Sequence, residues 1–148
     1  MSDDQRVIEF IAANRFPFPG QTDWPEGYQT IANGEHRAVS IPGINGPHWP
    51  DIVILDQDET PVRFGEVETT LDADAVARWA TSSRAADTMN ETGVQNLFVY
   101  VPAGSAPQAL ALLDQHGISF AGLREYEIDG DEVRVRPFVT RGDRYDHQ

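Results

Sequence analysis

Three acidic side chains, Asp51, Glu66 and Glu68, lie in two short apolar segments of the sequence. Asp51 begins the run 51–55, and Glu66 and Glu68 stand two residues apart in the alternating run 62–69. Residues two apart on a strand project from the same face, roughly 6–7 Å apart along it. If the two runs pair, the three carboxylates converge and can hold a divalent cation, because oxygen ligands suit Mg²⁺ and Mn²⁺. Carboxylates that close otherwise resist simultaneous ionisation.

Acidic pairs with this spacing also arise by chance, because 24 of the 148 residues are acidic. The same spacing recurs in Asp56/Asp58, Asp72/Asp74, Glu125/Glu127 and Asp129/Asp131. Glu66 and Glu68 differ from these pairs because Phe64 and Val67 place them in a strand that feeds the core, where acidic residues are depleted. The pattern alone leaves a functional cluster and a chance arrangement both open.

Two strands are predicted to carry the three acids. Residues 51–55 form a short apolar run that is typical of a buried strand. The turn residues 56–61 separate this run from residues 62–69, whose alternation gives one face that is half apolar and half acidic. A connection this short makes the two strands antiparallel neighbours. The carboxylates are then expected to meet at one end of the pair.

A helix and further strands extend this pair into an α/β domain. The helix begins at Asp72 or Asp74, carries Trp79 as its apolar anchor and ends at Gly93, before the apolar strand 97–101. A strand, helix, strand unit predicts a parallel crossover. The flanking segments are predicted as an N-terminal helix over 2–14, an irregular connection over 16–27, a hairpin of strands 28–31 and 37–41 around Asn33-Gly34, a helix capped by Ser105 and closed by Gly117, and a C-terminal hairpin over 120–139 around Asp129-Gly130. We therefore expect one α/β domain over residues 1–148 with a mixed sheet.

The charge of the chain is unusual, because 24 acidic residues face 11 basic residues that are all arginine. The net charge of −13 favours solubility and opposes binding to the phosphate backbone of nucleic acid. The absence of lysine resembles proteins from halophilic organisms, where high salt screens such repulsion. An arginine-biased genome explains it equally well, and the sequence leaves both explanations open.

Cysteine is absent from the chain, which excludes disulfides, thiolate nucleophiles and cysteine-ligated zinc. No apolar run approaches the roughly 20 residues that are needed to cross a bilayer. The start, Met1-Ser2-Asp3-Asp4, is acidic where a signal peptide is basic. These features predict a cytoplasmic protein with no membrane partner.

Two motifs, in this order of elements, resemble the PD-(D/E)XK phosphodiesterase superfamily, to which many restriction endonucleases belong. They are Pro50-Asp51-Ile52-Val53 and Gly65-Glu66-Val67-Glu68-Thr69. The resemblance covers most of the chain, from the N-terminal helix to about Tyr126. It implies a restriction endonuclease-like core, which consists of a helix, a three-stranded meander, a crossover helix and a further strand.

The resemblance implies a role for each residue of the cluster. Asp51 matches the first metal ligand and Glu66 the second, with the carbonyl of Val67 as a further contact to Mg²⁺ or Mn²⁺. Glu68 occupies the position where the family usually has a lysine that helps to activate water and stabilise negative charge. A glutamate cannot stabilise that charge, although it can accept a proton or hold a second ion. Some restriction endonucleases carry glutamate at this position.

Five further residues are candidates for substrate binding, and each has a structural alternative. His48 is either an outer-sphere base or a packed loop residue. Arg78 and Arg84 lie on the predicted crossover helix, where they either contact phosphate or form salt bridges. Arg134 and Arg136 share a strand face and form the best candidate for a phosphate-tracking patch, although nearby acids dilute it.

Three hypotheses follow. The first is a metal-dependent nuclease that hydrolyses DNA with Asp51, Glu66 and Glu68 as its acidic cluster. The second is a catalytically inactive protein of the same fold that binds a protein partner or serves assembly, which the missing lysine and the net charge favour. The third is an unrelated α/β domain in which the three acids do not converge. A chain this short would need to form a homodimer to embrace a duplex, through the apolar face of the last hairpin or of the crossover helix.

Overall fold

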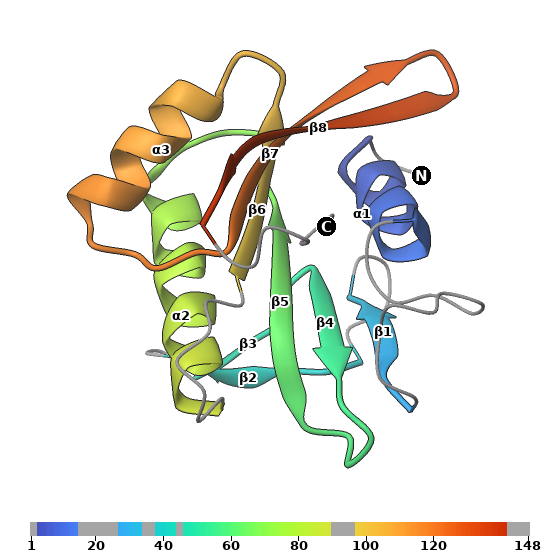
Figure 1. The fold of residues 1–148 in the computed structure, drawn as a ribbon, viewed down its shortest axis with the longest axis vertical. Coiled ribbons are helices and arrows are strands. Elements are labelled where there is room, and N and C mark those ends of the chain that lie inside the picture. The colour runs from blue at the N-terminus through green and yellow to red at the C-terminus, as the bar shows by residue number, and fades with distance from the viewer. Residues whose placement is uncertain (1–2, 15–26, 34–37, 44–45, 90–96, 142–148) are drawn as a thin grey trace.

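A mixed six-stranded sheet forms the centre of the computed structural model, which describes residues 3–14, 27–33, 38–43, 46–89 and 97–141 (Figure 1). The elements are α1 Asp3–Asn14, β1 Gln29–Ala32, β2 Ile41–Gly43, β3 Gly46–His48, β4 Ile52–Leu55, β5 Pro61–Val67, α2 Ala73–Met89, β6 Leu97–Pro102, α3 Ala106–Gln115, β7 Gly122–Asp129 and β8 Glu132–Thr140. Helix α1 lies on one side of the sheet, and α2 and α3 lie on the other. The predicted α/β class with a mixed sheet is confirmed for the described residues.

The strand order of the sheet is β1-β4-β5-β6-β7-β8. The central strands β5, β6 and β7 are parallel, because α2 and α3 each make a crossover between them. The pairs β1–β4, β4–β5 and β7–β8 are antiparallel. The predicted antiparallel pair, parallel crossover and C-terminal hairpin are therefore confirmed.

Two apolar clusters, one on each face of the sheet, hold the three layers together. On the α2 and α3 face, Val53 and Phe64 pack with Trp79. On the α1 face, Ile52 packs with Val7 and other residues of that helix. All four residues of β4 are buried, because the two faces of this strand are both covered, and this explains the uninterrupted apolar run in the sequence.

The hairpin predicted around Asn33-Gly34 is wrong, because β1 pairs with β4 and residues 38–40 are not a strand. Asn33 is buried rather than in an exposed turn, with a relative exposure of 6 %. Its amide nitrogen donates to the carbonyls of Val39 and Pro50, at 2.7 Å each, and its Oδ1 accepts from the N–H groups of Ala38 and Val39. The Asn33 side chain thus forms hydrogen bonds with backbone groups of the loop, in place of a partner strand. Gly34 and Arg37 lie outside the described residues.

The ends of the helices are set by acidic side chains. Asp72 begins α2, since its Oδ1 accepts a hydrogen bond from the N–H of Ala75 at 2.9 Å, and this bond lowers the pKa of Asp72. Ser105, the predicted cap of α3, makes no side-chain capping bond. Instead the carboxylate of Glu125 on β7 accepts from the N–H groups of Gly104 and Ala106, at 2.8 and 3.1 Å. The Ser2 and Gly93 helix ends and residues 16–26 lie outside the described residues.

Replacing Glu125 with alanine is expected to lower the free energy of unfolding by about 1 kcal/mol, the usual cost of losing a helix cap. The matched control is Glu127→Ala on the same strand, because Glu127 meets Arg134 at 3.6 Å in a pair where both side chains are about half exposed. Such surface pairs contribute little. Urea unfolding followed by circular dichroism measures both changes, and equal effects of the two substitutions would contradict the capping role.

The apolar stripe of α2 is used within the chain. Ala75 and Trp79 are fully buried against the sheet. The sequence suggests this stripe as one surface for a homodimer, but the sheet of the same chain covers Ala75 and Trp79. None of the described helices has the length and apolar character that a membrane crossing requires.

Candidate metal centre

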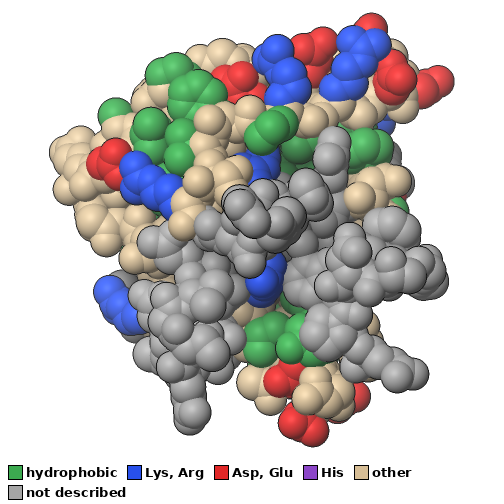
Figure 2. Space-filling model, in the orientation of Figure 1, with side chains coloured by type: hydrophobic (Ala, Val, Ile, Leu, Met, Phe, Trp, Pro, Cys, Tyr) green, Lys and Arg blue, Asp and Glu red, His purple; other side chains and the backbone are tan. Residues whose placement is uncertain are grey.

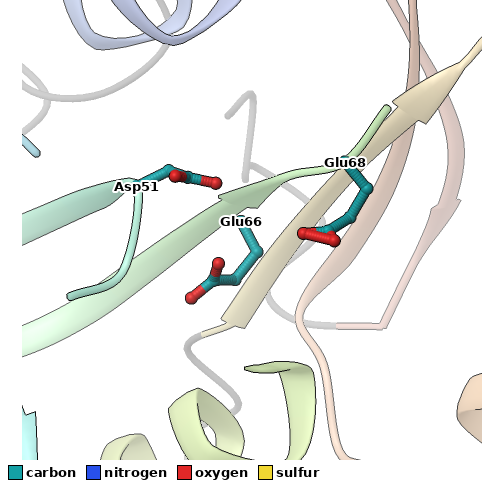
Figure 3. A group of neighbouring side chains, drawn as sticks. All are labelled: Asp51, Glu66 and Glu68. Carbon is teal, nitrogen blue, oxygen red and sulfur yellow. The ribbon is translucent and has the colours of Figure 1, made fainter. Parts of the chain in front are cut away.

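Asp51, Glu66 and Glu68 converge where β4 begins and β5 ends. Ile52 pairs with Gly65 in the antiparallel register, which sets Asp51 beside Glu66. Each residue contributes a carboxylate oxygen to a group in which all three oxygens lie within 4.8 Å of one another. Figure 3 shows that Glu66 and Glu68 leave their strand on the same side. The predicted convergence is confirmed, and the interpretation in which the three acids stay apart is wrong.

Glu66 is the most buried member of the cluster, with a relative exposure of 0 %. Its Oε1 accepts a hydrogen bond from Ser82 Oγ at 2.7 Å, and His48 Nε2 lies 2.9 Å from the same oxygen. The other oxygen, Oε2, is buried and has no hydrogen-bond partner among the described residues. Burial raises the pKa of Glu66 well above its ordinary value. Ser82 and His48 thus fix the orientation of a carboxylate that keeps one oxygen for a ligand.

Asp51 is held by the backbone of the neighbouring strand. Its Oδ2 accepts a hydrogen bond from the N–H of Val67 at 2.7 Å. Burial, followed by the nearby charge of Glu66, raises the pKa of Asp51 to about 8. The resemblance implies the Val67 carbonyl as a further contact, whereas the contact that the structure shows between Val67 and the cluster is this N–H donation.

Glu68, in contrast, forms an ion pair with Arg78 of α2. Arg78 Nε donates to Glu68 Oε1 at 3.1 Å, and Arg78 Nη2 donates to Oε2 at 2.7 Å. The Glu68 side chain is 1 % exposed, and the Arg78 side chain is 40 % exposed. Burial raises the pKa of Glu68, although the bonds to Arg78 act in the opposite direction. The phenol of Tyr126 on β7 donates to the carbonyl of Glu68 at 2.5 Å and fixes the chain where it leaves the sheet.

The spacing of α2 matches the spacing of β5. Ser82 and Arg78 stand four residues apart on the helix, a rise of about 6 Å. Glu66 and Glu68 stand two residues apart along the strand direction, a rise of about 6.6 Å. One turn of helix therefore places a partner opposite each glutamate, Ser82 at Glu66 and Arg78 at Glu68.

The other candidate residues divide between the cluster and the surface. His48, carried by the β2–β3 hairpin, joins the cluster, and burial lowers its pKa, which favours neutral imidazole. Arg84 is exposed on α2. On the β7–β8 hairpin, Arg134 forms ion pairs with Glu127, Asp129 and Glu132, and Arg136 forms one with Glu125. Figure 2 shows basic and acidic side chains interspersed there, so the predicted patch is not purely basic.

Sequence reasoning missed Ser82 and Tyr126. Ser82 could have been found from its place one helical turn after Arg78, once Glu66 and Glu68 were assigned to one face. Tyr126 gave no local signal, because it lies 58 residues from Glu68 in the chain.

The donor set fits a hard divalent cation. Asp51, Glu66 and Glu68 supply only oxygen, and the orphaned Glu66 Oε2 is a buried acceptor that requires a proton or a cation. Comparisons with protein-family models, with curated proteins and with solved structures give no match for this chain. The inference about function therefore depends on the geometry of the site.

Proposed function

We propose that this protein is a divalent-metal-dependent phosphodiesterase that hydrolyses DNA, with a PD-(D/E)XK-like core. The observation that carries the proposal is the buried convergence of Asp51, Glu66 and Glu68, with Glu66 Oε2 left unpartnered among the described residues. The order of α1, the β1, β4 and β5 meander, the α2 crossover and β6 supports the assignment of the core. Oxygen-only ligands favour Mg²⁺ or Mn²⁺.

Each residue has a part in the proposed chemistry. Asp51 and Glu66 hold the cation, and His48 and Ser82 fix the Glu66 carboxylate. A bound divalent cation polarises a phosphoryl oxygen and lowers the pKa of water. Arg78 forms the solvent-facing wall of the site, because its side chain is partly exposed, and the buried Glu68 lies behind it.

The test is hydrolysis of bis(p-nitrophenyl) phosphate and of plasmid, single-stranded and branched DNA, with millimolar Mg²⁺ or Mn²⁺. The small diester avoids the long-range repulsion between DNA and a chain of charge −13. We expect hydrolysis with either metal and none after chelation by EDTA. The absence of any heat of Mn²⁺ binding by calorimetry, with and without DNA, would refute the proposal.

A second candidate function is a non-catalytic binding or assembly module of the same fold, with a protein partner. It is favoured by the net charge of −13 and by the acidic partners of Arg134 and Arg136. In that case Mn²⁺ would raise Tm without hydrolysis of any substrate. Robust cleavage that is lost in variants of the acidic cluster would exclude this candidate.

A further inference from the structure

The three acids of the cluster are not equivalent. Among the described residues, Glu66 Oε2 has no hydrogen-bond partner, and Asp51 accepts a hydrogen bond at Oδ2 and not at Oδ1. Both oxygens of Glu68 accept bonds from Arg78. A bidentate guanidinium–carboxylate pair is directional and strong, and breaking a buried pair leaves an uncompensated charge. A cation can therefore be received by Asp51 and Glu66 without disturbing Glu68.

The charges lead to the same division. Three carboxylates face one guanidinium in this cluster, beside the His48 imidazole, which adds no charge in its neutral form. When the three acids are ionised, two negative charges remain uncompensated, and one divalent cation neutralises them. A second divalent cation would place two excess positive charges in a buried site, beside the guanidinium of Arg78.

Arg78 is placed to meet a ligand from solvent. Two of its five N–H donors bond to Glu68, and the other three have no partner among the described residues. Its side chain is 40 % exposed, whereas those of Glu66 and Glu68 are 1 % exposed. The guanidinium therefore lies at the boundary between the buried carboxylates and solvent, with donors left for an oxyanion.

We propose that this is a one-ion site in which Glu68 is a positioning residue, not a metal ligand, and that Arg78 binds the phosphodiester. The inference rests on the proposed function. Arg78 supplies the fixed positive charge beside the ion. The two oxygens of Glu68 hold the plane of the guanidinium through the hydrogen bonds from Nε and Nη2. The three N–H groups that do not bond to Glu68 donate to the non-bridging oxygens of the phosphodiester, for which guanidinium geometry is well suited.

The decisive variant is the double substitution Glu68→Gln/Arg78→Gln. It removes one negative and one positive charge together, so the net charge of the cluster does not change. Titration of Mn²⁺ followed by electron paramagnetic resonance is expected to give one ion per chain for the wild type and for the double variant, with Kd values within about threefold. A loss of Mn²⁺ affinity of about thirtyfold or more in the double variant, or two ions per wild-type chain, would overturn the inference.

Substrate binding is tested with single variants. Arg78→Gln is expected to keep one bound Mn²⁺ but to lower kcat/KM for bis(p-nitrophenyl) phosphate by roughly a hundredfold or more, the usual cost of losing a donor to a developing oxyanion. Arg78→Lys keeps the positive charge but lacks the planar guanidinium, so it is expected to recover part of this loss. Arg141→Gln is the matched control and should leave kcat/KM unchanged, because Arg141 is also 40 % exposed and donates two bonds to a carboxylate, that of Asp114, outside the cluster. Unchanged hydrolysis in Arg78→Gln would overturn the role of Arg78.

The outcomes separate this inference from the proposed function. If the wild type binds no Mn²⁺, both fail together. If Asp51→Asn abolishes both Mn²⁺ binding and hydrolysis, and the charge-neutral double variant also loses the ion, the proposed function stands and Glu68 is a ligand. Thermal unfolding by circular dichroism confirms that each variant is folded before it is compared.

Discussion

Asp51→Asn is expected to abolish metal-dependent hydrolysis, by about a thousandfold or more, and to weaken Mn²⁺ binding by at least about a hundredfold. Asparagine keeps an oxygen that accepts the Val67 N–H, so the local backbone contact survives. It removes one of the two carboxylates that we assign as ligands. Loss of an orienting partner of a ligand already costs about 10–100-fold in metal affinity, so loss of the ligand itself costs more.

The same substitution is expected to stabilise the metal-free protein at pH 9. The pKa of Asp51 is raised to about 8, so at pH 9 the wild type carries this buried charge beside Glu66. Removal of this uncompensated buried charge is expected to raise the free energy of unfolding by on the order of 2–5 kcal/mol. A variant that is more stable but inactive separates a functional carboxylate from a structural one.

The matched control is Asp56→Asn at the other end of β4. Asp56 Oδ1 accepts bonds from the N–H groups of Asp58 and Thr60 in the exposed turn, and an asparagine oxygen can do the same. Mn²⁺ affinity, by calorimetry, and hydrolysis should match the wild type in this control. Wild-type Mn²⁺ affinity in Asp51→Asn would remove Asp51 from the ligand set.

The second large effect is the pH dependence of stability without metal. The pKa of Asp51 is raised to about 8, and the pKa values of Glu66 and Glu68 are raised, in each case chiefly by burial. A raised pKa in the folded state means that the folded protein binds more protons than the unfolded chain. The associated stability is complete below about pH 4 and is lost as the pH rises through about 8. The free energy of unfolding is therefore expected to fall across this window by several kcal/mol.

His48 acts in the opposite direction. Burial lowers its pKa, so its contribution to stability is present above the unfolded value near 6.5 and is lost as the pH falls. Because three acids oppose one histidine, the free energy of unfolding is still expected to fall as the pH rises. Asp51→Asn should flatten the dependence of the free energy of unfolding on pH between pH 4 and 8. Subtraction of the variant's curve from the wild-type curve cancels the general repulsion among surface acids, because both proteins share it.

Mn²⁺ should offset part of this loss of stability at pH 8, because a ligand at a hundred times its Kd contributes about 2.7 kcal/mol. Binding should also release protons, which appears as a dependence of the calorimetric heat on the ionisation enthalpy of the buffer. Urea unfolding from pH 4 to 9, with EDTA or with Mn²⁺, measures the effect. A wild-type curve that is parallel to that of Asp51→Asn would contradict the raised pKa.

The core of the site could be predicted because the residues that form it are close together in the sequence. The run 51–55, the short turn and the alternation of 62–69 fix an antiparallel pair, and a strand period of two then sets Glu66 and Glu68 on one face. Asp51 follows from the register. β4 is buried throughout and β6 in all but its last residue, Pro102, and both strands are apolar on both faces, so their presence could also be predicted from composition alone.

The rest of the site depends on contacts that leave no local pattern. His48 reaches Glu66 through the β2–β3 hairpin. The stronger turn signal in the sequence is Asn33-Gly34, but the amide of Asn33 is buried and bonds to loop backbone. Glu125 replaces Ser105 as the cap of α3 because β7 lies beside that helix end only in the folded chain. Arg78 was placed on the correct helix, but the choice between phosphate and salt bridge required the geometry of Glu68.

The bond from the Tyr126 phenol to the Glu68 carbonyl connects the site to a strand made 58 residues later. During synthesis, the segment that carries the acids emerges before β7 can add to the sheet. Contacts of such long sequence separation form late, because loop closure must be completed before they contribute. The chain is therefore expected to complete its site only after most of the sheet has assembled, and a nascent or truncated chain that lacks β7 would carry the acids without the Tyr126 bond to Glu68.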